Sequence, residues 1–143
     1  MRSRCCSEYI PHASIKISMR IIRSIFLRKW YTRAIGVAFI LVVISLLVDL
    51  RQFGFRPESM HKIFHGMLGA IVARYGWNDR RWWGAFPLAN GAFFSFVMAF
   101  GLLFPDFGGL DAFNGTDTIL HGLVGISGLI IGLSGLLLSK KFQ

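Results

Sequence analysis

Four apolar stretches, separated by shorter polar segments, set the hydrophobic pattern of this chain. Three of them carry almost no charge and cover Ala34 to Leu50, Trp83 to Phe104 and Thr118 to Ser139. A helix needs about 20 mostly apolar residues to cross the hydrocarbon core of a bilayer, where it satisfies its own backbone hydrogen bonds. The pattern therefore predicts three membrane-spanning helices.

A fourth stretch, Ser59 to Trp77, is shorter and contains Lys62, His65 and Arg74. On hydropathy alone it fits an interfacial helix as well as a span. With four spans, however, the basic ends of the chain and the Arg80–Arg81 turn lie on one side and the acidic loop after the third span lies on the other. Lys62 and Arg74 lie near the ends of this stretch, where long side chains can reach water. We therefore expect an all-α membrane protein with four transmembrane helices.

The composition agrees with a lipid environment. Of 143 residues, 54% are hydrophobic and only 16% are charged, which is too apolar for an ordinary soluble domain of this size. A net charge of +9 would suggest nucleic-acid binding in a soluble protein, but here the basic residues lie beside the apolar stretches. We therefore expect the lipid bilayer, and no nucleic acid, as a partner.

Basic residues gather at both ends of the chain and at the middle turn. Eight Lys and Arg residues occur in residues 1–33, and Lys140 and Lys141 lie near the other end. Since cytoplasmic segments collect Lys and Arg, we expect both termini and the middle turn to be cytoplasmic. We expect residues 1–33 to form a basic, partly disordered cytoplasmic segment and residues 34–143 the transmembrane domain. Met1 and Met19 fit equally well as the start of translation. The acidic residues expected on the outer side are Glu58, Asp106, Asp111 and Asp117.

The second and fourth apolar stretches contain a repeated motif. The segment from Ile63 to Gly69 matches the segment from Ile119 to Gly125 in its Ile, His and both Gly residues. Two copies of a two-span unit insert in the same direction, which predicts two tandem helical hairpins related by a pseudo-two-fold axis along the membrane normal. The alternative is coincidence, because membrane helices use few residue types.

Small residues recur at helical spacing beside the repeated histidines. Glycines in such a stripe let two helix backbones approach closely, which stabilises membrane helix pairs. The stripes could be used within the monomer or leave a face for a homo-oligomer or a membrane-complex partner. The glycines expected to pack helices are Gly66, Gly69, Gly122, Gly125, Gly128, Gly132 and Gly135.

The histidines in the membrane allow several interpretations. The simplest is that neutral imidazoles hydrogen-bond neighbouring helices. A second is a zinc or copper site, because His61 and His65, like Asp117 and His121, lie four residues apart on one helix face. A third is haem, with His65 and His121 as axial ligands.

A fourth interpretation is proton or small-solute movement, for which Asn90, Ser95 and Arg74 are the other polar candidates. The sequence contains no hydrolase or nucleotide-binding motif, so a protein without enzymatic activity is favoured over an enzyme.

The paired His-Gly-x-x-Gly helices, the acidic loop before the second copy and the glycine-rich last span together resemble a bacterial family of small four-helix integral membrane proteins of unknown function. The resemblance covers residues 34 to 138. It implies the four-helix architecture and a bacterial inner (plasma) membrane, and it implies no activity, substrate or cofactor. We therefore expect a structural or accessory role in that membrane. The alternative is a metal- or haem-binding redox or sensor protein that uses His65 and His121.

Overall fold

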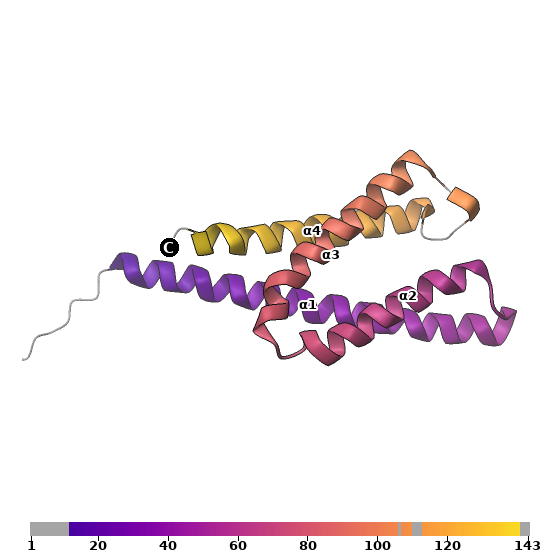
Figure 1. Ribbon diagram of the computed structural model, residues 1–143, viewed down its shortest axis with the longest axis horizontal. Helices are drawn as coiled ribbons and strands as arrows, with labels where there is room; N and C mark the ends of the chain where they lie inside the picture. Colours follow the sequence, from indigo (N-terminus) through magenta and orange to yellow (C-terminus); the bar gives the residue numbers. More distant parts are fainter. Residues whose placement is uncertain (1–11, 106, 110–112, 141–143) are drawn as a thin grey trace, which may run out of the picture.

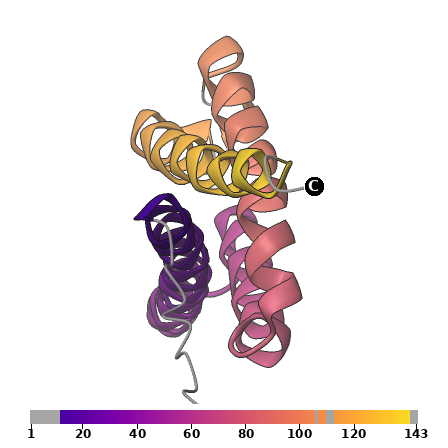
Figure 2. The same cartoon turned by 90° about the vertical axis from the view of Figure 1, so that its left-hand side faces the viewer.

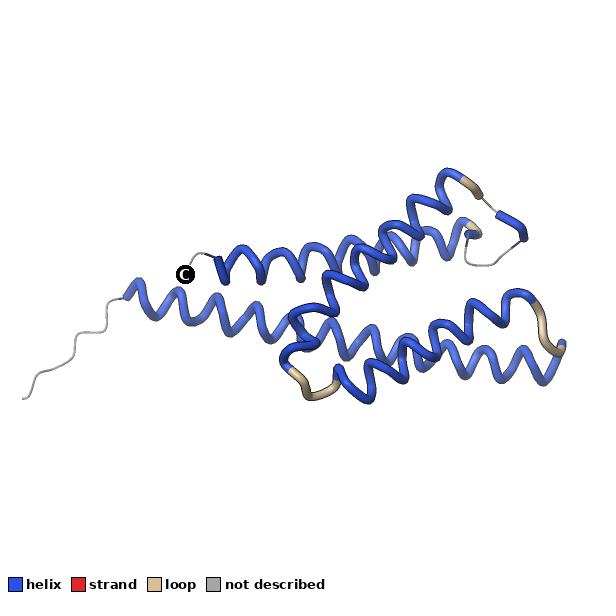
Figure 3. Tube along the Cα trace, viewed as in Figure 1, coloured by secondary structure: helices blue, strands red, loops and turns tan. Residues whose placement is uncertain are grey.

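The computed structural model describes residues 12–105, 107–109 and 113–140, and it is helical apart from short turns (Figures 1 and 3). Its α-helices are α1 (His12–Phe53), α2 (Pro57–Ile71), α3 (Arg80–Leu103) and α4 (Gly115–Lys140). A π-helical turn, Val72–Gly76, continues α2, and a 3-10 turn, Phe107–Gly109, precedes α4. These ranges contain no strand, so the expected all-α class is confirmed. Expectations for residues 1–11, Asp106, Asp111 and Lys141 lie outside the described residues.

Three of the helices are long and apolar enough to cross a membrane. They are Met19–Phe53 in α1, Arg80–Leu103 in α3 and Gly115–Leu137 in α4, with mean hydropathies of 2.4, 1.7 and 1.9 over their most apolar windows. Each covers nearly all of one of the three apolar stretches predicted to span. Large apolar side chains on their outer faces are exposed, as expected for helices surrounded by lipid.

The first helix is longer than the span expected from the sequence. It begins at His12 rather than Ala34 and runs for 42 residues, which corresponds to about 63 Å. The described part of the expected cytoplasmic segment, residues 12–33, is therefore helical. The physical reason is that Ile, Leu, Arg and Lys residues dominate this part of the chain and no Gly or Pro interrupts it, so an established helix continues through it.

The helices form two antiparallel pairs. Helix α1 packs beside α2, and α3 packs beside α4, while α3 and α4 also contact α1. The α1–α2 and α3–α4 turns lie at one end of the molecule, and the α2–α3 turn faces the other way (Figure 1). The end-on view shows α3 reaching from the α1–α2 pair to α4 (Figure 2). Phe39, Val72 and Phe94 are buried where these helices meet.

All seven glycines of the predicted stripes lie against a neighbouring helix. At Gly69, a Cβ atom would lie 2.9 Å from the backbone nitrogen of Ile40 on α1. At Gly125, it would lie 2.5 Å from the backbone nitrogen of Ser95 on α3. Contacts this short need glycine, because backbone atoms cannot move aside as a side chain can. At the other five, the nearest atom to the added Cβ belongs to a side chain and lies within 2.6 Å, and these glycines are Gly66, Gly122, Gly128, Gly132 and Gly135.

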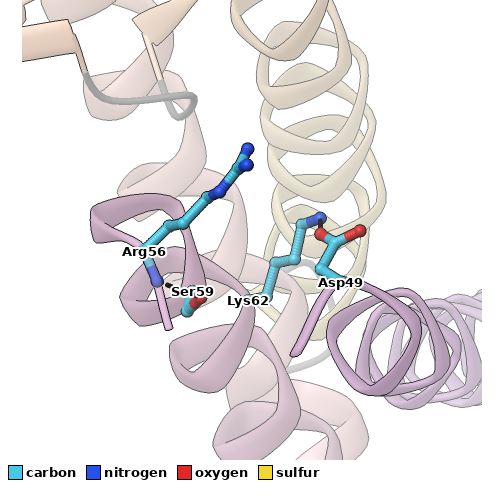
Figure 4. Close-up of polar contacts among 4 residues, drawn as sticks. All are labelled: Asp49, Arg56, Ser59 and Lys62. Carbon is cyan, nitrogen blue, oxygen red and sulfur yellow. Dashed lines mark hydrogen bonds and ion pairs between the residues drawn. The ribbon is translucent and has the colours of Figure 1, made fainter. Parts of the chain in front are cut away.

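Polar contacts join α1 to α2 near their shared turn. The side chain of Lys62 forms an ion pair with Asp49 of α1 (Figure 4). The backbone N–H of Arg56 donates to Ser59 Oγ at 3.1 Å, and Pro57 occupies the first turn of α2, where a missing N–H costs little. These contacts fix the start of α2 and thereby the direction of its histidine-bearing face.

Contacts at the opposite end of α2 satisfy its last carbonyls. Trp83 Nε1 donates to the carbonyl of Gly76 at 2.8 Å, and the guanidinium of Arg33 donates to the carbonyl of Trp77 at 2.8 and 3.0 Å. Helix ends leave carbonyl groups without intrahelical partners, so these donors complete the π-helical turn. The turn thus joins α2 to both α1 and α3.

Candidate metal centre

Three histidines from two helices meet near the end of the molecule that holds the α1–α2 and α3–α4 turns. His61 and His65 lie one turn apart on α2, so their side chains project from one face. His121 approaches them from α4. One ring nitrogen from each of the three residues lies within 4.8 Å of the other two. Residues 56 positions apart in the sequence therefore share one site.

The two imidazoles on α2 are in direct contact. Their Nε2 atoms lie 2.7 Å apart, so one nitrogen must donate a proton and the other must accept it. Two nitrogens bound to one tetrahedral zinc ion, each at 2.0–2.1 Å, lie roughly 3.3 Å apart. A separation of His61 and His65 by about 0.6 Å is therefore enough for both to bind one ion.

Aromatic rings fix the orientation of the two buried imidazoles. Phe94 of α3 stacks on His65 with ring centroids 5.7 Å apart, and on His121 with centroids 5.2 Å apart. Phe39 of α1 packs against the His65 ring at 4.9 Å. His65 and His121 are 7% and 6% exposed, and Phe94 is 2% exposed. These two imidazoles are thus held at a defined angle, and little of their surface is exposed.

One nitrogen of this cluster is buried without a hydrogen bond. His65 Nδ1 has no partner among the described residues. A buried polar atom without a partner costs about 1–3 kcal/mol, and such an atom in a native structure needs an explanation. A role of His65 in the cluster that outweighs this cost would explain the unpaired nitrogen.

A cavity of about 330 Å³ adjoins the histidines. All four helices contribute to its wall, with α3 supplying Phe94. The cavity can hold an ion together with water or a small ligand. Half of its twelve lining residues are apolar, and the polar ones are Ser45, His61, Lys62, His65, Asp117 and His121.

Asp117, expected from the sequence as a fourth ligand, lines the same cavity but lies outside the three-histidine cluster. Its backbone N–H donates to Asn114 Oδ1 at 2.8 Å in the first turn of α4. The structure therefore brings together three of the four expected ligands. Lys62 also faces the cavity, where its ammonium group pairs with Asp49.

The other polar residues considered for solute movement lie outside this cavity. Asn90 donates to the hydroxyl of Tyr31 at 2.8 Å, and that hydroxyl donates to the carbonyl of Val124 at 2.9 Å. The hydroxyl of Ser95 is buried beside α4, and Arg74 is exposed. These contacts join helices rather than extend the histidine site.

The sequence did not reveal that Phe94 packs against the histidines. Phe94 lies three residues after Gly91, on the face of α3 that is buried. That spacing was the only available signal, and it does not single out Phe94 because the chain contains 14 Phe residues.

Comparison of the chain with protein-family models, curated proteins and solved structures gives no match. The chemistry of the site must therefore be interpreted from its own residues.

Proposed function

We propose that this chain is a four-span protein of a bacterial inner membrane that binds a zinc ion through His61, His65 and His121. The observation that carries the proposal is the approach of three imidazole nitrogens to within 4.8 Å at the edge of a cavity. Three histidines with an open fourth position are a frequent zinc coordination set. The function is therefore metal binding within the membrane rather than helix packing alone.

Helix α2 and its π-helical turn support a fourth span. Together they form a continuous helical segment from Pro57 to Gly76, and its 20 residues correspond to about 30 Å, the thickness of the hydrocarbon core. Its outer face exposes Phe64, Met67 and Ile71, which suits contact with lipid. The pairing of α1 with α2 and of α3 with α4 supports tandem hairpins, and the basic middle turn supports cytoplasmic termini.

The third histidine favours a metal ion over haem and over simple helix packing. Haem iron takes two axial ligands from opposite sides of the macrocycle. Here His61 Nε2 lies 2.7 Å from His65 Nε2, so it fills the space that the macrocycle would need beside His65. Simple helix packing needs one hydrogen bond between two imidazoles, whereas a third imidazole at the same point adds a desolvation cost that a metal ligand bond offsets.

Zinc binding is tested with the purified full-length protein in a mild detergent. Isothermal titration with ZnCl₂ is expected to give one site per chain. Replacement of His61, His65 or His121 by Ala is expected to weaken zinc binding by at least about 100-fold, because loss of even a supporting group of a metal site costs 10- to 100-fold. The matched control is His12→Ala, which removes the remaining histidine of the sequence.

Thermal unfolding gives a second measure of zinc binding. Zinc at 100 times the wild-type Kd stabilises the wild-type protein by about 2.7 kcal/mol. The same concentration stabilises the His121→Ala variant, with its at least 100-fold weaker affinity, by at most about 0.4 kcal/mol. Wild-type protein that binds no zinc, or histidine variants that lose stability with zinc affinity intact, would overturn the metal site. Binding of copper without zinc would overturn the choice of ion.

Membrane topology is tested by cysteine labelling in intact bacterial cells. With Cys5 and Cys6 replaced by Ser, single cysteines at Gln52 and Asn78 probe the two ends of α2, and both positions are exposed. An impermeant maleimide is expected to label Gln52→Cys in intact cells and Asn78→Cys only after lysis. Equal labelling of both positions in intact cells would mean that α2 does not span.

A further inference from the structure

A second cavity lies at the opposite end of the molecule from the histidines, between α1 and α3. Its volume is about 160 Å³, and its lining residues are Ile25, Arg28, Arg80, Trp83 and Gly84. Two of these five residues are arginines from different helices. The cavity shares no residue with the histidine site and is independent of metal binding.

The structure makes room for the Arg28 side chain between helices. A Cβ atom at Gly135 of α4 would lie 2.2 Å from the Arg28 guanidinium carbon, and a Cβ atom at Gly84 of α3 would lie 3.8 Å from Nη1. Nη2 donates to Ser24 Oγ at 3.1 Å. Nε is buried and has no hydrogen-bond partner in the described part of the chain. Arg28 is thus held in place with donor capacity left over.

No carboxylate neutralises this pair of arginines within the described ranges. The carboxylate of Asp49 pairs with Lys62 at the far end of the molecule. The nearest acidic residue in sequence, Asp79, accepts from the backbone N–H of Arg81 at 2.8 Å and so caps α3. Lys29 adds further positive charge, 5.3 Å from the Trp83 ring. A guanidinium without a counter-ion beside a membrane-type helix is costly, so an external anion is favoured here.

We propose that this cavity binds the phosphate group of an anionic phospholipid between Arg28 and Arg80. Guanidinium groups bind phosphate oxygens through two parallel hydrogen bonds, and basic pockets between membrane helices commonly hold anionic head groups. The cavity has the volume of about five water molecules at ~30 Å³ each, which accommodates a phosphate group.

The surroundings favour a lipid over free phosphate. Ile25 lines the cavity, and the adjacent outer face of α1 exposes Ile22 and Phe26 toward acyl chains. Trp83 is also a residue type that concentrates at the level of lipid head groups. An acyl-linked phosphate gains from both the charged cavity and the apolar face, whereas inorganic phosphate gains only from the charge.

The proposal is tested by native mass spectrometry of the full-length protein in detergent. Phosphatidylglycerol and phosphatidylcholine are added separately, and retained lipid is counted. Wild-type protein is expected to retain one phosphatidylglycerol and little phosphatidylcholine. Arg28→Gln and Arg80→Gln are each expected to weaken phosphatidylglycerol binding about five-fold, the effect of one basic residue at a membrane surface.

The matched control is Arg81→Gln, which removes the same charge one residue away and does not line the cavity. This variant is expected to bind phosphatidylglycerol as the wild type does. Because Arg28 packs between helices, its variant could lose structure, and the exposed Arg80 provides the independent test. Equal losses for Arg80→Gln and Arg81→Gln would indicate diffuse surface charge and overturn the site. Full displacement of phosphatidylglycerol by millimolar inorganic phosphate would overturn the lipid as its occupant.

Discussion

Replacement of Gly125 by Ala should separate α3 from α4. The added Cβ atom would lie 2.5 Å from the backbone nitrogen of Ser95 and 2.9 Å from the backbone carbon of Phe94. Ordinary contact begins at 3.4 Å, so the two backbones must move apart by almost 1 Å at this point. Both opposing atoms belong to the backbone, so no rotamer change relieves the clash.

The expected loss of stability is about 1–2 kcal/mol. Overpacking of a close contact costs typically 1–3 kcal/mol, and the better helix propensity of Ala returns up to about 1 kcal/mol of this. The movement also shifts Phe94, whose ring stacks on His121, so zinc affinity should fall together with stability. The glycine is therefore required by both the helix pair and the site.

Unfolding in mixed detergent micelles with increasing sodium dodecyl sulfate, followed by circular dichroism, measures this loss. The matched control is Gly115→Ala at the first residue of α4, where no atom lies within 4 Å of the added carbon. The control should stay within about 0.5 kcal/mol of the wild type. If Gly125→Ala and Gly115→Ala were equally stable, the close approach of α3 and α4 at Gly125 would be refuted.

Two further predictions concern polar contacts between helices, measured by the same unfolding assay. Asp49→Asn removes the ion pair with Lys62. Both side chains are partly exposed, so this change should lower the free energy of unfolding by at most about 1 kcal/mol. The double variant in which Asp49 and Lys62 exchange their charges should recover the loss, and no recovery would contradict the pairing. Tyr31→Phe removes the hydroxyl that joins Asn90 to a carbonyl of α4, and it should lower the free energy of unfolding by about 0.6–1.7 kcal/mol. The control is Tyr75→Phe at an exposed position, which should cause no measurable change. Equal effects of the two Tyr variants would argue against the buried network.

The helical class and the three long apolar helices could be predicted from the sequence, because uncharged stretches of this length have few alternatives. The start of α1 could not, since the basic residues before Ala34 indicate membrane orientation and helix formation equally well. The π-helical turn after Ile71 was also not predictable, because it is completed by donors from Arg33, far away in the sequence, and from Trp83 on the next helix. Whether α2 spans the membrane stays a prediction.

The candidate site was partly accessible from the sequence. The four-residue spacing placed His61 and His65 on one face, and the repeated motif associated them with His121. The sequence could not show that Asp117 stays outside the cluster, because this depends on the rotation of α4 about its axis. It could not select Phe94 among the Phe residues either, since that depends on where α3 crosses the other helices.

The position of the three histidines has a mechanical consequence. Helices α2 and α4 do not pack directly along their lengths, and the two antiparallel pairs meet mainly through α1, which contacts both α3 and α4. An ion held by His61 and His65 on one side and His121 on the other would cross-link the pairs at the end where their turns lie. Its arrival or departure would then change how far the two halves can swing apart, so that ion concentration would set the shape of the molecule at one membrane surface.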